Sequence, residues 1–426
     1  MDFPTSLPSS SPSNLPWWRE PTRPQWLAFG SAWAGWVLDA FDFTIFLLVM
    51  PHIAKEMGVK SLATTGSIAL TLTARLLGGY VAGSAADRWG RRLPLMISIV
   101  GFALCDGAVS MAPSFAAILV LRTLFGFFMG AEWATGTTLA MESWPARSRG
   151  LASGVLQGSW AVGYLAAGVI APRVLASHYG WRGLFVVAAL PAVFVLVARK
   201  WVPESEEWKE SHGHRASAKT ALPLRAMLPK LAWACGTMAA GFGAYYGLTG
   251  LYPTLLKTEL GLTDGRVGEL VVLFNIGMLS GSIVTGTLAA KHGTGWAIVF
   301  PSLLSLAVIP IYVGAYPALL GVGAFLGGAI AVGFCGVTPL LLTELFPAEG
   351  RARLIGIAYH VGSFGAAFVP MTIAAIAQSS GMPLSRAITL VAGVCEVAIA
   401  ALVLAPTIRG VARRLSARTG ATEEAS

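Results

Sequence analysis

The chain consists largely of long apolar runs separated by short polar segments. A helix needs about 20 apolar residues to cross roughly 30 Å of hydrocarbon at about 1.5 Å per residue. Twelve runs have about this length, and each predicts a membrane-spanning helix. Their approximate limits are 27–51, 62–86, 93–111, 115–141, 150–171, 183–201, 231–252, 267–289, 296–315, 317–343, 354–377 and 385–405.

Composition and charge support this interpretation and orient the chain. Of the 426 residues, 55% are hydrophobic and 12% charged, and the mean hydropathy is +0.67, values typical of a polytopic membrane protein. If both termini are cytoplasmic, the cytoplasmic segments carry 21 Lys and Arg residues and the external loops 7. The positive-inside rule therefore predicts two cytoplasmic termini. The net charge of +9 is spread over short loops, so no nucleic-acid partner is expected.

The sequence lacks the patterns that would indicate chemistry or processing. Its four cysteines lie in four different apolar runs, which predicts neither disulfides nor a metal site. There is no nucleotide-binding loop and no nucleophile paired with a base, so we expect no enzyme activity and no cofactor apart from a coupling proton. Residues 1–26 contain no short apolar h-region, so no removed signal peptide is expected.

The two halves of the chain repeat each other. The segment Gly83–Arg92 recurs in weaker form as Gly286–Gly295, and Glu142–Gly154 recurs as Glu344–Gly356. The repeat predicts an all-α membrane protein with two six-helix lobes, an arrangement typical of a transporter with its site between the lobes. The expected division is a cytoplasmic tail 1–26, an N-terminal lobe 27–201, a central cytoplasmic loop 202–230, a C-terminal lobe 231–406 and a cytoplasmic tail 407–426.

Specific motifs resemble a known family. The loop "GSAADRWGRR" resembles the hallmark loop of the major facilitator superfamily between its second and third helices, and "RTLFGFFMG" resembles that superfamily's segment in helix four. More narrowly, "PWWREPTRPQWLAF", "LDAFDF", "GAEW", "ESWP" and "PESEEWKE" are similar to bacterial sialic-acid:proton symporters, a family that includes lactate and pyruvate permeases.

The resemblance implies a function and a location. It implies a secondary active transporter of the bacterial cytoplasmic (inner) membrane that imports an organic carboxylate together with protons by alternating access. The expected partners are this small carboxylate, protons and the lipid bilayer, and a monomer is expected.

Two departures affect the expected substrate. Residues 202–230 are too short and polar for the two extra hydrophobic segments typical of sialic-acid members, and Ala40 replaces a glycine found in many relatives. Sialic acid and a small monocarboxylate such as lactate therefore both stay open, with aromatic acids third. A proton-driven drug or metabolite exporter is the alternative from another class, although "GSWAVGYLAAGV" lacks the proline common in exporters. A transporter-like sensor would more often carry an appended domain.

Asp39 and Asp42 lie in the middle of an apolar run. A charge at the bilayer centre costs about 2.5–3.5 kcal/mol, so such residues face water, a partner or a ligand. At spacing i,i+3 the two side chains lie about 60° apart on one helix face, and close carboxylates in a low dielectric resist ionising together. The pair is therefore suited to carrying a proton. The alternative is that it only ties helix one to Arg75 or Arg122.

Helix four contains Arg122 and Glu132. Their ten-residue separation corresponds to about 15 Å of rise, so they serve different depths. Arg122 can hold a carboxylate through two parallel hydrogen bonds and is the first candidate for the substrate anion, with a structural pairing to a helix-one aspartate as the alternative. Glu132 is predicted to be a further protonation site nearer the cytoplasm, unless it only bonds a loop or neighbouring backbone.

Further polar residues inside the predicted helices are candidates for substrate contact. Arg75 lies about three turns before Asp87 and could serve the cavity or the cytoplasmic gate, with the gate slightly favoured. Single polar residues in membrane helices more often bond a neighbouring helix. Asp106 and Glu396 are expected at helix interfaces or the lipid edge. The other substrate-binding candidates are Gln157, Tyr245, Tyr246, Asn275, Tyr359 and His360.

The loop after the second span is interpreted as a gate. The resemblance implies that it forms charge contacts across the cytoplasmic ends of the lobes and holds the outward-open state. The gating candidates are Gly83, Asp87, Arg88, Gly90, Arg91 and Arg92. Glycine pairs at spacing four, such as Gly126 and Gly130, predict close helix packing. Trp89 flanks a span and is expected at the membrane interface.

Overall fold

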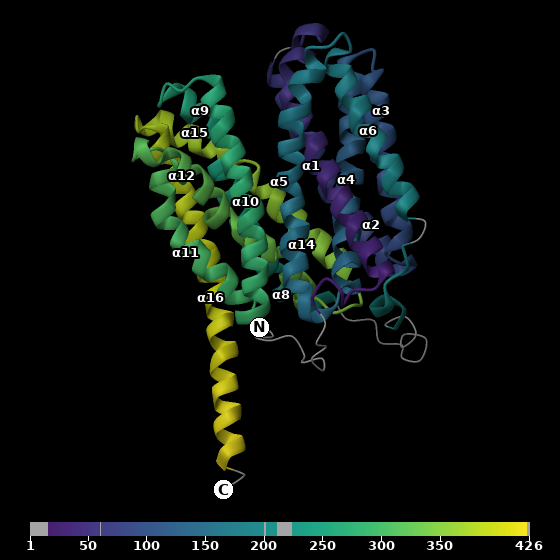
Figure 1. The fold of residues 1–426 in the computed structure, drawn as a ribbon, viewed down its shortest axis with the longest axis vertical. Helices are drawn as coiled ribbons and strands as arrows, with labels where there is room; N and C mark the ends of the chain where they lie inside the picture. Colours follow the sequence, from purple (N-terminus) through teal and green to yellow (C-terminus); the bar gives the residue numbers. More distant parts are fainter. Residues whose placement is uncertain (1–15, 60, 200–201, 211–223, 424–426) are drawn as a thin grey trace.

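The computed structural model describes residues 16–59, 61–199, 202–210 and 224–423, and this part of the chain is helical without a strand. Two helical lobes stand side by side, with both ends of the chain on the same side of the molecule (Figure 1). The first lobe contains α1 (Arg23–Met57), α2 (Ser61–Trp89), α3 (Arg92–Ser110), α4 (Phe115–Ser143), η1 (Ala146–Ser148), α5 (Arg149–Leu175) and α6 (Gly180–Arg199).

The second lobe repeats this plan with more interruptions. Its elements are α8 (Leu224–Thr249), α9 (Tyr252–Thr258), α10 (Asp264–His292), α11 (Thr294–Tyr312), η2 (Pro317–Leu319), α12 (Leu320–Leu326), η3 (Gly327–Val332), η4 (Gly333–Val337), α13 (Thr338–Leu345), α14 (Arg351–Ala366), α15 (Val369–Ser380) and α16 (Leu384–Glu423). Helical segments overlap all twelve predicted ranges. Within the described residues, ten candidate spans are long and apolar enough to cross a membrane.

Several predicted helix limits were wrong. The first predicted range ends at residue 51, whereas α1 continues to Met57. The range 317–343 is not one regular helix but includes the π-helix η3 and the 3-10 helix η4. These tightly packed turns are rich in glycine, and a Cβ on Gly328 would lie 1.9 Å from the Phe274 carbonyl oxygen. The range 354–377 breaks between α14 and α15, where Pro370 cannot continue a backbone hydrogen-bond ladder.

The C-terminal helix also exceeds its predicted limit. α16 continues to Glu423, well past the expected end of the span at residue 405, and projects from the bundle (Figure 1). Parts of the predicted tail 1–26 and of the central loop 202–230 lie outside the described residues.

Glycines set the close packing of helices within each lobe. A Cβ on Gly126 would lie 2.2 Å from the Thr71 carbonyl oxygen, and one on Gly130 would lie 2.0 Å from that of Arg75. Both distances are impossible for a real side chain, so α4 and α2 can approach this closely only with glycine at these positions. The predicted role of this glycine pair in close helix packing is confirmed.

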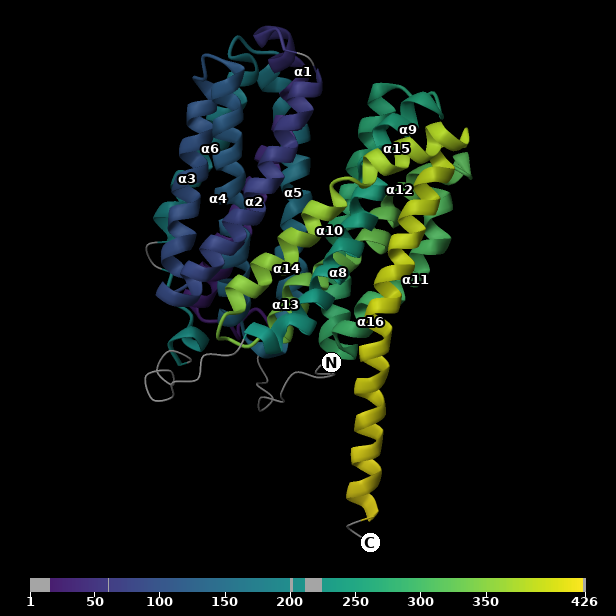
Figure 2. The same ribbon diagram turned by 180° about the vertical axis from the view of Figure 1, so that it is seen from behind.

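The two lobes contact each other mainly through α5 with α10 and α2 with α14. They lie closest at the end that bears the termini and diverge toward the other end (Figure 2). A Cβ on Gly154 would lie 2.2 Å from the Ser282 carbonyl oxygen, and one on Gly83 would lie 2.7 Å from that of Ala352. Small residues therefore allow the lobes to close against each other at this end.

Candidate functional site

A buried charge cluster joins α1, α3 and α4 inside the first lobe. The Arg122 guanidinium donates to both oxygens of Asp42, with Nη1–Oδ1 at 3.2 Å and Nη2–Oδ2 at 2.5 Å. Its Nη1 also donates to Asp106 Oδ1 at 3.3 Å. All three side chains are at most 2% exposed. Such a desolvated, bidentate arrangement ties the three helices together.

Aromatic rings surround the Arg122 guanidinium. Its carbon lies 3.9 Å from the ring centre of Phe125, 4.6 Å from Phe46 and 5.8 Å from Phe185. These rings belong to α4, α1 and α6 of the same lobe. In this conformation the geometry matches the alternative interpretation of Arg122, pairing with an aspartate of α1, and anion binding by Arg122 remains an untested prediction. The sequence analysis missed Asp106 as its second partner.

A second charged cluster lies one turn earlier on α1. The Asp39 carboxyl group is fully buried, and neither of its oxygens has a hydrogen-bond partner among the described residues. Glu132 of α4 and Arg75 of α2 lie close enough to act on its charge. Glu132 and Arg75 are 2% and 3% exposed. Asp42 also acts on the charge of Asp39. Asp42 is thus paired with Arg122, whereas Asp39 lies near Glu132 and Arg75. The predicted proton-carrying role of the two aspartates stays a prediction.

Arg75 lies beside aromatic rings of both lobes, and among the described residues no hydrogen bond or ion pair joins it to the gating residues. Within the part of the chain that the structure describes, its Nε and Nη2 atoms are buried without a hydrogen-bond partner. Its guanidinium carbon lies 5.6 Å from the Trp36 ring centre and 5.8 Å from that of Tyr359. A buried guanidinium with uncommitted donors is suited to bind an anion.

Aromatic residues from both lobes surround Arg75. Trp133 of α4 stacks on Tyr359 of α14, with ring centres 3.3 Å apart and planes inclined by 20°. Trp36 lies against Trp133 at 6.0 Å, and Phe242 of α8 meets Tyr359 edge-on at 4.7 Å. The stacked pair of Trp133 and Tyr359 therefore joins the two lobes beside Arg75.

A layer of hydroxyl groups extends this aromatic cluster. The Trp160 indole N–H of α5 donates to the Tyr245 hydroxyl of α8 at 3.0 Å, which crosses the lobe interface. Tyr164 interacts with Tyr245 and Tyr246. The structure thus brings the predicted candidates Tyr245 and Tyr246 to the interface between the lobes.

The remaining candidates fall into two groups. Gln157 of α5 interacts with Tyr359, and His360 Nε2 lies 3.1 Å from the Gly130 carbonyl oxygen of α4. Both therefore lie between the lobes. Asn275 differs, because its side-chain amide donates to the Val271 carbonyl of its own helix at 2.9 Å.

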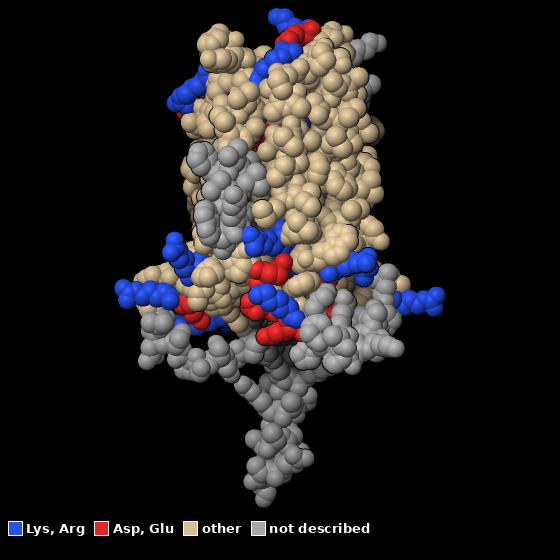
Figure 3. Space-filling view, turned by 90° about the vertical axis from the view of Figure 1, so that its right-hand side faces the viewer, with Lys and Arg blue, Asp and Glu red and all other residues tan. Residues whose placement is uncertain are grey.

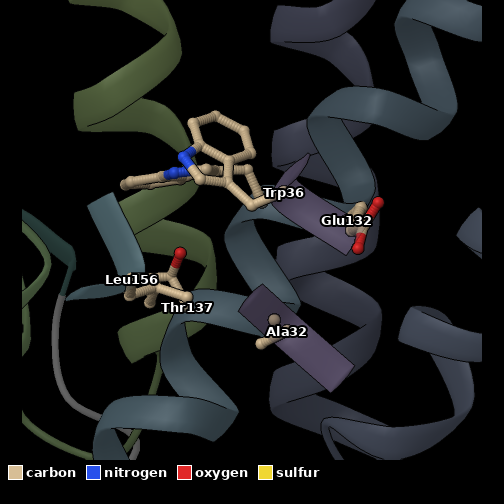
Figure 4. A pocket seen from close by; sticks show the side chains of 7 residues that line it. Ala32, Trp36, Glu132, Thr137 and Leu156 are labelled. Atoms are coloured by element: carbon tan, nitrogen blue, oxygen red, sulfur yellow. The ribbon is translucent and has the colours of Figure 1, made fainter. Parts of the chain in front are cut away.

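A small pocket opens beside the carboxyl cluster. Ala32 and Trp36 from α1, Glu132 and Thr137 from α4, and Leu156 from α5 line it (Figure 4). Its volume of about 10 Å³ holds about one water molecule. Glu132 therefore borders a water-sized space.

The predicted gating residues lie where the lobes meet near the chain termini. Asp87 accepts the backbone N–H groups of Ala352 at 3.1 Å and Arg353 at 3.0 Å, in the first turn of α14. This carboxylate stabilises the positive end of a helix from the other lobe. Arg91 donates to the Ala348 carbonyl at 3.0 Å and to Glu142 at 3.1 Å.

The other gating candidates contribute differently. Gly90 has a φ of +96° at the end of α2, a conformation that favours glycine. A Cβ there would also lie 2.3 Å from the Glu204 carboxylate. Arg92 donates its backbone N–H to Glu204 at 3.1 Å. Arg88 is exposed and lies against Trp89, with its guanidinium carbon 5.5 Å from the ring centre.

Residues 202–210, which the sequence analysis treated only as part of a loop, bind across this gate. Glu204 accepts the Arg91 backbone N–H at 2.8 Å, and Ser205 donates to Glu142 at 2.5 Å. The Glu207 carboxylate pairs with Arg149 at 3.3 Å and also with Arg351 of the second lobe. The run of acidic residues in "PESEEWKE" could have indicated this role from the sequence. The sequence does not indicate which basic residues and backbone groups these acids bind.

The charged surface supports a membrane setting. Charged side chains gather at the two ends of the face in Figure 3, and the band between them shows few charged side chains. Two packed lobes of apolar helices, with buried charges and an aromatic site between them, define a multi-pass membrane transporter.

Sequence comparison identifies the family. The model of the Major Facilitator Superfamily matches residues 32–263 and 233–425. The chain belongs to this superfamily, as its motifs predicted, and it is a transporter and not an enzyme. The two matches correspond to the two halves of the repeat.

Individual relatives carry different organic molecules. The chain is 29% identical to the sialic acid transporter NanX of Escherichia coli (strain K12), over 88% of this chain and 93% of the relative. It is 30% identical to a probable 4-methylmuconolactone transporter of Cupriavidus pinatubonensis, over 83% of this chain and 84% of the relative. It is 28% identical to the cis,cis-muconate transport protein of Acinetobacter baylyi, over 84% of this chain and 89% of the relative.

A solved structure confirms the fold. The proton:xylose symporter XylE, bound to 6-bromo-6-deoxy-D-glucose, superposes with a TM-score of 0.69 at 19% identity, covering 88% of this chain and 94% of XylE. At this identity the likeness shows the fold alone.

Proposed function

We propose that this chain is a proton-coupled symporter that imports an organic carboxylate across the bacterial inner membrane by alternating access. In this proposal twelve helices cross the membrane, both termini are cytoplasmic, and the protein works as a monomer. The contacts of Asp87, Arg91 and Arg351 then close the cytoplasmic side, so the structure corresponds to an outward-facing state.

One observation carries the proposal: Arg75 is buried between the lobes near the carboxyl group of Asp39, with two donors that have no partner among the described residues. We assign the substrate carboxylate to these donors. Arg122, the first candidate from the sequence, already has Asp42 and Asp106 as partners. Binding at Arg75 therefore requires no existing ion pair to break.

The charge balance at this site links binding of the substrate anion to binding of a proton. Arg75 with Asp39 and Glu132 is neutral when one of the two carboxyl groups holds a proton. A substrate anion adds one negative charge, and neutrality then requires a second proton. Net charge buried in a low dielectric is costly, so binding one monoanion favours uptake of one proton. The proton also cancels the work of about 2.3 kcal/mol per 100 mV that opposes entry of an anion into a negative-inside cell.

The site favours a planar, unsaturated or aromatic carboxylate within this class. The ring centres of Trp36 and Tyr359 lie 5.6 and 5.8 Å from the Arg75 guanidinium carbon, so a flat ligand held by Arg75 would contact aromatic rings. The relatives named for muconate and methylmuconolactone fit this chemistry. Sialic acid is the second candidate, because NanX is similar over most of its length. Lactate is too small to cover these rings.

Transport in liposomes tests the proposal. Purified protein should accumulate cis,cis-muconate or benzoate when the outside is acidified, and a protonophore should abolish the accumulation. Arg75→Gln should prevent it, whereas Arg225→Gln, which changes an exposed arginine at the start of α8, should not. Accumulation that survives the protonophore unchanged would contradict proton coupling.

A thermal-shift panel tests the substrate class separately. Ligands that bind the native state raise the melting temperature. Muconate, benzoate, sialic acid and lactate should be compared at equal concentration. Stabilisation by sialic acid alone would replace the planar-acid assignment, and stabilisation by lipophilic cations with no carboxylate would favour the exporter alternative.

A further inference from the structure

A groove lies on the outer surface of the first lobe between α2, α3 and α4, near the end that bears the termini. Ala82, Ala85 and Trp89 of α2 form one wall, Leu93 and Ile97 of α3 another, and Phe127, Phe128 and Ala131 of α4 the remainder. Its volume is about 180 Å³. Ser98 brings a polar side chain into the lining, and its hydroxyl already donates to the Leu95 carbonyl at 2.8 Å.

The groove faces the membrane and not the other lobe. Trp89, Leu93 and Ile97 are 60%, 52% and 55% exposed. α3 lies at the outer edge of its lobe, away from the second lobe (Figure 1). Single exposed apolar side chains are ordinary on a lipid-facing surface, but a concave apolar channel is shaped to hold one hydrocarbon chain in a fixed place.

A positive charge lies at the end of the groove nearest the membrane surface. The Arg88 guanidinium stacks near Trp89, which lines the groove and sits at the end of α2. Within the described part of the chain Arg88 forms no ion pair, while its neighbour Asp87 is committed to Arg91 and α14. Tryptophan and arginine at this depth suit the boundary between acyl chains and headgroups.

We propose that this groove binds an anionic phospholipid, with one acyl chain between α2, α3 and α4 and the headgroup phosphate on Arg88. Charge complementarity selects this occupant, because a lipid supplies both a hydrocarbon chain and an anion at the required depth. The site is independent of the transport site, since the opposite face of α2 carries Gly83 and Asp87 against α14. Bound lipid therefore supports the helix that forms the gate.

Native mass spectrometry of the full chain, purified in detergent, tests the site. Phosphatidylglycerol and phosphatidylcholine with the same acyl chains should be added separately. Phosphatidylglycerol should bind more tightly, and Arg88→Gln should weaken its binding about fivefold, the effect of one basic residue near an anionic surface. Arg225→Gln, at an exposed arginine in the second lobe, should leave binding unchanged.

A groove-filling variant tests the acyl-chain part of the site. Ala85→Phe should weaken binding of phosphatidylglycerol, while Val284→Phe, at a 55% exposed position of α10, should not. Melting temperatures measured without lipid show whether each variant is folded. Arg88→Gln, at an exposed side chain, tests the site independently if Ala85→Phe fails to fold.

Three results would overturn the proposal. If the wild type, Arg88→Gln and Ala85→Phe all retain phosphatidylglycerol and phosphatidylcholine equally, the bound lipid is the general lipid shell around the protein and not a specific site. Binding of glycerol 3-phosphate as tight as that of the lipid would mean that charge alone is recognised. A dimer that disappears in Ala85→Phe would mean that a second copy of the chain occupies the groove.

Discussion

Asp42 and Arg122 are joined by two hydrogen bonds, of 3.2 and 2.5 Å, in the interior of the first lobe. Asp39, one turn earlier, lies instead near Glu132 and Arg75. Two aspartates that look equivalent in sequence thus belong to two clusters. This separation leads to different predictions for the two residues.

Asp39→Asn and Glu132→Gln should each abolish proton-driven accumulation and preserve exchange of substrate between equal pools. Exchange needs no net proton movement, whereas accumulation requires a carboxyl group that gains and loses a proton during the cycle. Counterflow and uphill uptake in the same liposomes measure the two activities. Full accumulation by both variants would show that this carboxyl pair only holds α1 against α4.

Asp42→Asn should mainly destabilise the protein. The substitution leaves the buried Arg122 with Asp106 as its remaining charged partner, and breaking a buried pair costs roughly 3–5 kcal/mol. The melting temperature in detergent should fall, as it should for Arg122→Gln. Glu56→Gln serves as the control, since Glu56 pairs with Arg182 at a site where both side chains are more than one third exposed. A stable Asp42→Asn protein that has lost only proton coupling would instead make Asp42 the proton carrier.

Arg75→Lys should lose most substrate binding while the protein stays folded. Lysine keeps the charge but cannot reproduce the forked geometry that holds a carboxylate with two parallel hydrogen bonds. The ligand-induced rise in melting temperature should disappear, and uptake and exchange should fall together. If Arg122→Lys removes binding and Arg75→Lys does not, the anion site lies at Arg122.

Tyr359→Ala should alter substrate preference. The Tyr359 ring stacks on Trp133 and faces Arg75, so its removal takes away a flat contact worth about 0.5–1.5 kcal/mol beyond its buried area. Affinity for planar acids should fall more than affinity for aliphatic acids in a competition assay. Tyr316→Ala, at a residue 58% exposed, provides the matched control. An equal loss for both ligand classes would argue against stacking.

Asp87→Asn should weaken the closure between the lobes. The variant removes the negative charge that stabilises the first turn of α14. Spin labels at Trp89 and Lys291, in a cysteine-free background, should report a larger share of long distances. Asp264→Asn, an exposed acid at the start of α10, should leave the distances unchanged. An unaltered distribution in Asp87→Asn would show that other contacts hold the lobes closed.

The sequence by itself determined the fold class and the family. Apolar runs of spanning length and the repeat between the halves predict helices in two lobes, because burying backbone in lipid demands internal hydrogen bonds. The Gly126 and Gly130 pair also predicted close helix packing, but only the structure shows that the partner is α2. Helix interruptions such as η3 escaped prediction, because they depend on how closely a neighbouring helix approaches.

Only the tertiary structure decided which charges belong together. Helical spacing placed Asp39 and Asp42 on one face, but their partners Glu132, Arg75 and Arg122 come from other helices. Rotation and depth of those helices are set by packing against neighbours, and local sequence does not encode them. For the same reason Arg75, which sequence spacing placed slightly nearer the gate, lies among aromatic rings from both lobes.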